Sequence, residues 1–168
     1  VPTIKFALLQ AINLAEKEVL ITTPYFIPSK SIMDALLIAA KSGVKVKLIV
    51  PNNSDSKLVN AAACSYYLDL LKSGVEIYRY TKGFVHAKTM VIDNEIAIVG
   101  TANMDVRSFD LNFEVGAIVY DEEIAEELKA TFYKDVEGTS QLDLIEWEKR
   151  PAVYRFLDKL ARLFSPIL

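Results

Sequence analysis

Residues 83–103 read GFVHAKTMVIDNEIAIVGTAN and contain His86, the only histidine in the 168-residue chain. Lys88 follows two positions later, and residues two apart on an extended strand point to the same side of a sheet. The stretch therefore predicts a nucleophile or proton carrier beside a fixed positive charge. Such a pair suits a substrate that carries a phosphate group.

Two apolar runs, 87–92 and 96–99, flank the polar residues 93–95 and predict a β-hairpin. In an antiparallel pair with its turn at these polar residues, positions whose numbers sum to about 188 face each other. This register places Lys88 beside Gly100, at the end of the hairpin away from the turn.

Four polar side chains are expected to converge at that end of the hairpin, namely His86, Lys88, Thr101 and Asn103. They are the groups needed around a tetrahedral phosphate on which negative charge develops. Asp93 lies at the other end of its strand. It is included among the candidate catalytic residues because it belongs to the same pattern, although its position favours a structural role, bonding turn backbone or a distant basic residue.

Glu114 is a charged residue in the apolar run FEVGAIVY, which predicts a strand over 113–120. An unpaired carboxylate would be costly there. Two interpretations are open. The carboxylate holds one ring nitrogen of His86 so that the other stays nucleophilic, or it pairs with Arg107 or caps a loop.

The loop PYFIP at 24–28 follows a predicted strand at 19–23. Open α/β sheets place ligands just beyond the ends of their strands. Tyr25 and Phe26 are therefore expected to bind substrate, as the wall of a pocket for an acyl chain or a glycerol group. Ile27 is expected to fold onto the core.

Helical and strand patterns alternate through the first 80 residues, which is typical of a sheet with parallel members. The hairpin makes the sheet mixed, so we predict an α/β fold over residues 1–140, with a mixed β-sheet sandwiched between helices. Helices are expected at 4–18, 32–42, 57–72 and 122–136, and strands at 19–23, 44–50, 75–80, 87–92, 96–99 and 113–120. Candidate N-caps are Thr3, Ser29 or Ser31, and Asp121.

Residues 141–168 are predicted to form an amphipathic helical tail. Its apolar stripe consists of Val153, Phe156, Leu157, Leu160, Leu163 and Phe164, and the basic residues Arg155, Lys159 and Arg162 lie away from the stripe. Most amphipathic helices in globular chains pack their apolar face on the domain. The other interpretation is a helix that lies on an anionic membrane surface.

Composition limits the class of protein. The length suits one domain with a sizeable core, and the formal charge of -3 argues against a domain that coats nucleic acid. One histidine and one cysteine cannot build a His/Cys zinc site. The sequence contains no run of about 18 apolar residues, so no membrane span is predicted. The chain opens at Val1 without an initiator methionine, and we expect it to be a piece of a longer protein.

The pattern His86-x-Lys88-x4-Asp93-x6-Gly100-Thr101-x-Asn103 resembles the signature of the phospholipase D superfamily. The resemblance continues through Asp105-x-Arg107-Ser108 and Asn112-x-Glu114. It looks closest to the C-terminal half of bacterial cardiolipin synthases, where runs similar to GTANMDVRSF and LNFEV also occur. The chain departs from many members at Asp55-Ser56, where they carry an Asp-His pair.

This resemblance implies a phosphatidyl transfer between two phosphatidylglycerol molecules, giving cardiolipin and glycerol through a phosphohistidine intermediate without a metal or cofactor. It implies that Lys88 and Asn103 hold the phosphate, that Thr101 assists, and that Glu114 orients His86. It also implies that the intact protein works at the bacterial cell membrane, on the cytoplasmic side.

The implied mechanism needs two histidines, and the chain has one. A second His-Lys-Asp motif is therefore expected from the N-terminal half of an intact protein or from a second chain. The isolated monomer is expected to be inactive, and phosphatidylglycerol or another anionic phospholipid, not nucleic acid, is the expected partner. Two alternatives stay open: a homodimeric single-motif phosphodiesterase or nuclease, and a non-catalytic domain that binds anionic lipid.

Overall fold

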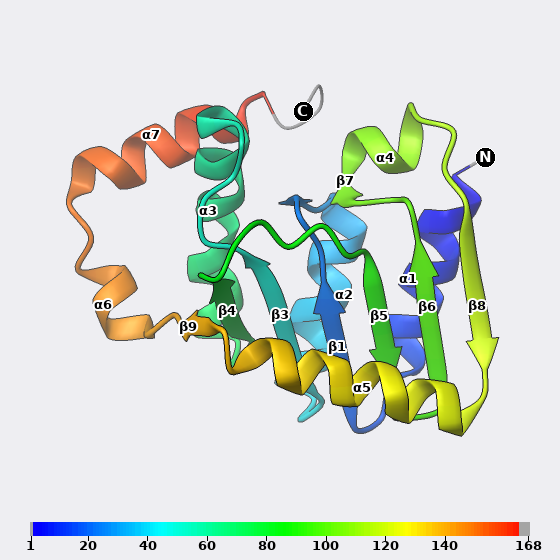
Figure 1. The fold of residues 1–168 in the computed structure, drawn as a ribbon. Helices are drawn as coiled ribbons and strands as arrows, with labels where there is room; N and C mark the ends of the chain where they lie inside the picture. Colours follow the sequence, from blue (N-terminus) through cyan, green and yellow to red (C-terminus); the bar gives the residue numbers. More distant parts are fainter. Residues whose placement is uncertain (1, 165–168) are drawn as a thin grey trace.

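The structure is a computed structural model that describes residues 2–164 of the chain. Within these residues a mixed sheet of seven strands forms the centre of the molecule, in the order β8-β6-β5-β1-β3-β4-β9 (Figure 1). Its strands are β1 (Glu18–Thr22), β3 (Lys45–Pro51), β4 (Glu76–Tyr80), β5 (Thr89–Ile92), β6 (Ile96–Gly100), β8 (Gly116–Tyr120) and β9 (Thr139–Gln141). The predicted α/β fold with a mixed sheet is confirmed.

Strands β1, β3 and β4 are parallel, and helices cross over between them. On the other side of β1, β5 is antiparallel to β1, and β6 is antiparallel to β5 in the hairpin. Within the hairpin Thr89 pairs with Val99 and Ile92 pairs with Ile96, so the predicted register is confirmed. This register matters for function because it fixes which residues meet at the open end of the hairpin.

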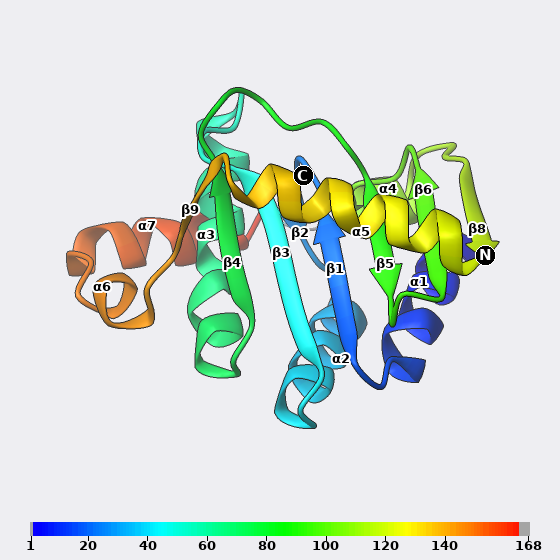
Figure 2. The ribbon, with the colours of Figure 1, turned by 60° about the horizontal axis from the view of Figure 1, so that its bottom comes forward.

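Helices cover both faces of the sheet (Figure 1 and Figure 2). They are α1 (Thr3–Leu14), α2 (Lys30–Lys41) and α3 (Lys57–Lys72) on one face, and α5 (Glu122–Val136) across the other. The larger core cluster lies under α1 to α3 and includes the buried Ile12, Leu36 and Leu70. The smaller cluster lies under α5, where Ala125 and Phe132 pack on the sheet. Two apolar layers therefore hold the strands that position the site.

Side-chain oxygens begin two of the helices as the sequence predicts. The Asp121 carboxylate accepts the backbone N–H of Ile124 at 3.0 Å, and the Ser29 hydroxyl accepts an N–H in the first turn of α2. The prediction that Thr3 is an N-cap is wrong, because α1 begins at Thr3 itself and Pro2 occupies the cap position.

The sequence pattern does not predict β9 or three other short elements. These are β2 (Phe26–Ile27), β7 (Met104–Asp105) and α4 (Val106–Asp110). Elements of two to five residues are too short to show a periodicity. The parallel pairing of β2 with β7 matters for the site, because it joins the loop at Tyr25 to the segment that follows Asn103.

The tail forms α6 (Leu144–Glu148) and α7 (Ala152–Arg162), and α7 lies against α3 (Figure 1). The predicted helical tail is confirmed and α7 packs on the domain, but the side that packs is not the apolar stripe. Asp158 and Ala161 face the domain, whereas the Phe156 side chain in the stripe is 66% exposed. Residues 165–168, the end of the predicted tail, lie outside the described residues. Within 2–164, no helix is long and apolar enough to cross a bilayer.

Candidate active site

His86 and Lys88 lie side by side in the extended segment that leads into β5. The Lys88 Nζ is 3.2 Å from Nδ1 and 3.1 Å from Nε2 of the His86 ring, and it donates to the His86 carbonyl oxygen at 2.9 Å. The backbone N–H of Gly100 donates to the Lys88 carbonyl oxygen at 3.1 Å, which confirms that these two residues are neighbours. Lys88 was expected inside the strand predicted at 87–92. Strand β5 begins at Thr89, so both His86 and Lys88 precede it.

Burial lowers the pKa of the Lys88 ammonium, while the carboxylates of Glu114 and Asp105 act in the opposite direction. Lys88 borders an apolar cavity of about 40 Å³ that Ile21 and Ile98 also line, with room for only a few water molecules. A poorly solvated ammonium interacts more strongly with an anion than one in bulk water does. Lys88 is therefore well placed to attract a phosphate oxygen.

Glu114 precedes β8 by two positions, so it lies outside the strand, which was predicted to begin at 113, and two polar neighbours hold it. The Thr101 hydroxyl donates a short hydrogen bond to its Oε2, and the Asn112 amide donates to its Oε1 at 3.2 Å. Within residues 2–164, no ion pair joins Glu114 to Arg107, which was one of the two interpretations open from the sequence. The orienting role of Glu114 toward His86 stays a prediction.

Gly100 allows β6 and β8 to approach each other at the site. A Cβ added there would lie 2.8 Å from the Val115 carbonyl oxygen and 3.1 Å from the Gly116 Cα. The Thr101 hydroxyl accepts the Val115 N–H at 3.0 Å in the next pair, so this close approach sets Thr101 against Glu114. A glycine at this position indicates that something approaches the backbone closely. Here the neighbour is the backbone of β8.

Asn103 follows β6 and carries the clearest unsatisfied group of the site. Its Oδ1 is buried and has no hydrogen-bond partner among the described residues, while its side chain bonds to Asp105. Burial raises the pKa of the Asp105 carboxyl, and hydrogen bonds from Ser108 and Asn103 oppose that shift. A buried acceptor without a partner costs stability.

A cavity of about 310 Å³ opens between Asn103, Arg107 and the Tyr25 loop. On its wall the Tyr25 hydroxyl donates to the Asp55 Oδ2 at 2.7 Å. Burial and this bond raise the pKa of Tyr25 to about 12, and the same bond lowers the pKa of Asp55. The cavity therefore presents a carboxylate, a phenol, an amide and a guanidinium, which suits a small polar group better than an acyl chain.

A row of aromatic rings joins this cavity to the histidine. The Tyr25 and Phe84 ring centroids are 6.2 Å apart, and those of Phe84 and His86 are 5.9 Å apart. Tyr25 therefore lies where the loop prediction expects it, on a cavity wall near His86. Phe84 precedes the motif by two positions, and its exposed aromatic side chain beside the sole histidine is a signal that sequence reasoning missed.

Phe26 does not line a pocket for substrate, so that prediction is corrected. Its side chain is 1% exposed, and its ring packs 6.5 Å from the Tyr67 ring in the core. The reason is that the short strand β2 pairs with β7 and lies against α3, so both of its side chains are enclosed. Ile27 is also buried, as expected.

Asp93 lies at the turn of the hairpin, at the end of β5 away from His86. Its carboxylate accepts backbone N–H groups from Glu16, Lys17 and Glu18 at 2.7, 2.7 and 2.8 Å. These bonds tie the connection between α1 and β1 to the hairpin. The geometry matches the structural role that its position favours, with the backbone of another connection as the partner.

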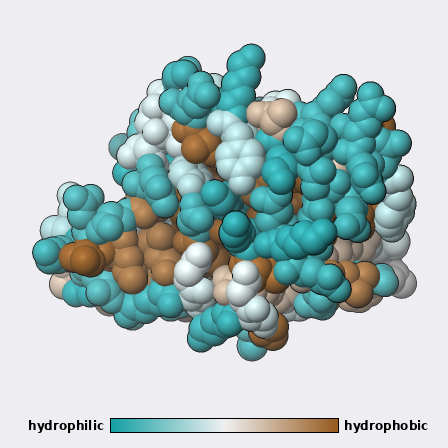
Figure 3. Space-filling model, turned by 90° about the horizontal axis from the view of Figure 1, so that it is seen from below, coloured by the Kyte–Doolittle hydropathy of each residue, from teal (hydrophilic) through white to brown (hydrophobic). Residues whose placement is uncertain are grey.

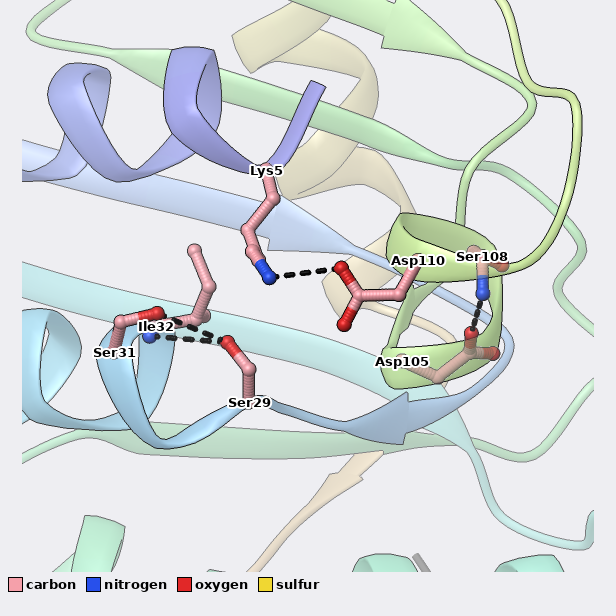
Figure 4. Close-up of polar contacts among 7 residues, drawn as sticks. All are labelled: Lys5, Ser29, Ser31, Ile32, Asp105, Ser108 and Asp110. Atoms are coloured by element: carbon pink, nitrogen blue, oxygen red, sulfur yellow. Dashed lines mark hydrogen bonds and ion pairs between the residues drawn. The ribbon is translucent and has the colours of Figure 1, made fainter. Parts of the chain in front are cut away.

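Sequence reasoning also missed residues that support the site from a distance (Figure 4). Lys5 in α1 reaches Asp110 in α4 at 2.8 Å, and Asp105 caps α4 by accepting the Ser108 N–H at 2.6 Å. Together these contacts fix the short helix that carries Arg107. An aspartate before a short helix is a recognisable cap signal. The Lys5–Asp110 pair spans 105 positions and leaves no local signal.

In the part of the chain that the structure describes, no group of three or more His, Cys, Asp or Glu side chains is arranged to hold a metal ion. The polar groups of the site are instead a histidine, a lysine, two amides, a hydroxyl and carboxylates. This set can bind a phosphate through Lys88 and bring the His86 ring to its phosphorus atom.

The family model and the curated relatives agree on one family. Residues 8–136 match the family model described as "Cardiolipin synthase, PLD-like domain". The chain is 48% identical over 165 residues to the major cardiolipin synthase ClsA of Bacillus subtilis, and the match covers 98% of this chain and 34% of that protein. The chain thus spans about a third of the length of the curated relatives it matches.

Two solved structures share the fold. The phospholipase D family member Nuc from Salmonella typhimurium has a TM-score of 0.72 at 22% identity, covering 82% of this chain and 90% of that one. Phosphatidylserine synthase from Haemophilus influenzae has a TM-score of 0.75 at 18% identity, covering 98% of this chain and 44% of that one. At such identities the likeness concerns the fold alone.

Proposed function

The chain belongs to the family of cardiolipin synthase phospholipase D-like domains, and we propose that it carries one half of the active site of a phosphatidyltransferase. The observation that carries the proposal is the Lys88 ammonium within 3.2 Å of both nitrogens of the His86 ring. In this arrangement a phosphate oxygen can bind the ammonium while a ring nitrogen of His86 faces the phosphorus atom.

The proposed reaction has two displacements at phosphorus. A ring nitrogen attacks the phosphodiester of phosphatidylglycerol, so an N–P bond forms, the P–O bond to glycerol breaks, and a second histidine gives the departing glycerol its proton. That histidine then takes the proton from a hydroxyl of another phosphatidylglycerol. The hydroxyl oxygen attacks phosphorus, the N–P bond breaks, and cardiolipin is released. His86 takes one of these two roles.

The other residues of the site supply charge and position. Lys88 and Asn103 hold the non-bridging oxygens as negative charge builds up on them. The Glu114 carboxylate raises the pKa of Lys88 against the effect of burial, which helps to keep the ammonium charged, and it fixes the Thr101 hydroxyl. We further propose that Glu114 orients His86 when the site is complete.

A second half of the site is proposed to dock beside β8. This strand is at the edge of the sheet, and an edge strand offers unpaired backbone groups to another chain or domain. Phe113 and Val115 place large apolar side chains in solvent on either side of Glu114, and Tyr120 does so at the far end of β8. Such a surface favours a covered state. The second histidine would come from the N-terminal half of an intact protein or from a second copy of the chain.

The cavity beside Asn103 is the proposed site for the glycerol headgroup. Asp55 and Tyr25 offer an acceptor and a hydroxyl on its wall. Glycerol hydroxyls can bond to both. The substrate is therefore proposed to be phosphatidylglycerol of the bacterial cell membrane, with the intact protein acting from the cytoplasmic side.

The proposal is tested by analysing products from vesicles of phosphatidylglycerol incubated with the intact protein. Cardiolipin and free glycerol are expected in equal amounts, and the isolated monomeric chain is expected to form neither. A parallel incubation with plasmid DNA tests the nuclease alternative. Cleaved plasmid without any lipid product would refute the proposed function, and full transfer by a proven monomer of this chain would refute the half-site.

A further inference from the structure

Helix α7 turns most of its apolar side away from the protein, while Phe156 borders a cavity of about 410 Å³ that α3 and α6 also line. The side chains of Phe156 and Leu163 are 66% and 74% exposed. The same side of the helix carries the exposed apolar residues Val153, Leu157 and Leu160, and Leu163 and Phe164 follow directly after its end. In a space-filling view from below, hydrophobic side chains gather at the left of the molecule, where α6 and α7 lie (Figure 3).

The polar side of α7 is the one that holds it to the domain. Asp158 is buried and accepts from Arg150 at 2.9 Å, Ala161 is buried against the core, and Arg162 lies 4.2 Å from the centroid of the Tyr66 ring. A surface helix of a globular protein normally buries its apolar stripe and exposes its charges. The reversed orientation fixes α7 in place and leaves its apolar face free for another surface.

The charges of α7 indicate what that surface is. Its basic residues Arg155, Lys159 and Arg162 are exposed, and its one acidic residue, Asp158, is paired with Arg150. This helix is therefore basic although the chain as a whole has a formal charge of -3. A helix with bulky apolar residues on one side and basic residues beside them suits the boundary between anionic headgroups and acyl chains.

We propose that α7 docks on an anionic phospholipid bilayer, with Phe156, Leu160 and Leu163 entering the acyl boundary and Arg155 and Lys159 binding headgroup phosphates. The choice of lipid as the occupant rests on the proposed function. The docked helix holds the domain at the membrane surface, where its phospholipid substrate lies.

Co-sedimentation of the 168-residue chain, which has its own hydrophobic core, tests this directly. The probes are vesicles of equal parts phosphatidylglycerol and phosphatidylcholine, and vesicles of phosphatidylcholine alone. The double variant Phe156→Glu/Leu160→Glu is expected to bind the mixed vesicles at least about tenfold more weakly. The matched control is Ile38→Glu, an equally exposed apolar residue on α2, and it should bind as the unchanged chain does.

A second pair of changes tests the charges. Arg155→Ser and Lys159→Ser should each weaken binding to the mixed vesicles by about fivefold and reduce its sensitivity to salt, with little effect on phosphatidylcholine vesicles. Circular dichroism must show that each variant keeps its helix content. Equal binding by the unchanged chain and the Phe156→Glu/Leu160→Glu variant would overturn the proposal.

The apolar face has one other plausible occupant, a protein surface. If the chain ignored both vesicles but formed dimers that Phe156→Glu/Leu160→Glu dissociated, α7 would be a protein interface and the proposal would be wrong. The test is separate from catalysis, because His86→Ala is expected to leave vesicle binding unchanged. The intact protein with Phe156→Glu/Leu160→Glu should still act on short-chain phosphatidylglycerol dispersed in detergent.

Discussion

At the scale of single residues, the contact between Lys88 and His86 decides what the site can do. The ammonium lies against the ring without an ion pair among the described residues, so its charge is available to a ligand. Replacement of Lys88 by methionine keeps the length and removes the charge. We expect the transfer rate to fall by about 10²- to 10³-fold.

The matched control for this change is Lys82→Met, an exposed lysine in the same segment that should leave the rate unchanged. Initial rates of cardiolipin formation by the intact protein measure both variants. A rate for Lys88→Met within about twofold of the unmodified protein would contradict the assigned role of Lys88.

The lowered pKa of Lys88 predicts an alkaline limit to activity. The ammonium loses its proton at a lower pH than an ordinary lysine does, so kcat/KM should decline as the pH rises through that lowered value. Stability should change in the opposite direction, because the folded state favours the neutral amine and is stabilised as the pH rises over the same range. Lys88→Arg does not titrate there, and its pH profile should lack this alkaline decline.

At the scale of elements, Gly100 sets the distance between β6 and β8. Gly100→Ala would place a methyl group 2.8 Å from the Val115 carbonyl oxygen, so β8 must shift and Glu114 must move with it. We expect a loss of about 1–3 kcal/mol in the free energy of unfolding and a lower transfer rate.

Gly116→Ala is the control for this prediction, because its Cβ would lie 3.9 Å from the Val99 carbonyl oxygen, an ordinary contact. Chemical denaturation and rate measurements on both variants make the comparison. Equal effects of the two substitutions would show that close packing at Gly100 is not what positions Glu114.

The hydrogen bonds of Asp93 predict that its replacement lowers the stability of the fold without lowering catalytic activity. Asp93→Ala removes a carboxylate that accepts three backbone N–H groups, and we expect the free energy of unfolding to fall by about 2–3 kcal/mol. Activity per folded molecule should be almost unchanged. Asp34→Ala removes an exposed carboxylate paired with Lys30 and should cost less than about 1 kcal/mol. Loss of activity by fully folded Asp93→Ala would show that Asp93 takes part in catalysis.

Elements differ in how well the sequence predicts them. The hairpin register follows from a turn of known position, so the neighbourhood of Lys88 and Gly100 is recovered. The bounds of α3 and α5 are also recovered, because both are long and periodic. The two-residue strands β2 and β7 have no period, so the burial of Phe26 could not be foreseen from the sequence.

At the scale of the whole molecule, a sequence pattern shows which side of a helix is apolar but not what covers it. The sequence predicts the apolar stripe of α7 correctly. It does not predict that the stripe is exposed, because this depends on α3 packing against the opposite side of the helix. The same limit applies to the site. The motif gives His86, Lys88 and Asn103, whereas the Tyr25–Asp55 bond depends on two loops that meet only in the fold.

The molecule as a whole has one histidine, an exposed edge strand next to Glu114 and an outward-facing basic amphipathic helix. All three features are consistent with one half of a membrane-bound transferase. The central claim is that His86 takes part in the transfer at phosphorus. It is tested most directly by measuring cardiolipin formation from phosphatidylglycerol by the intact protein with His86→Ala.

We expect the rate to fall by about 10³-fold or more, with thermal unfolding and vesicle binding unchanged. Cardiolipin formation by the folded His86→Ala protein at the rate of the unmodified protein would contradict the account.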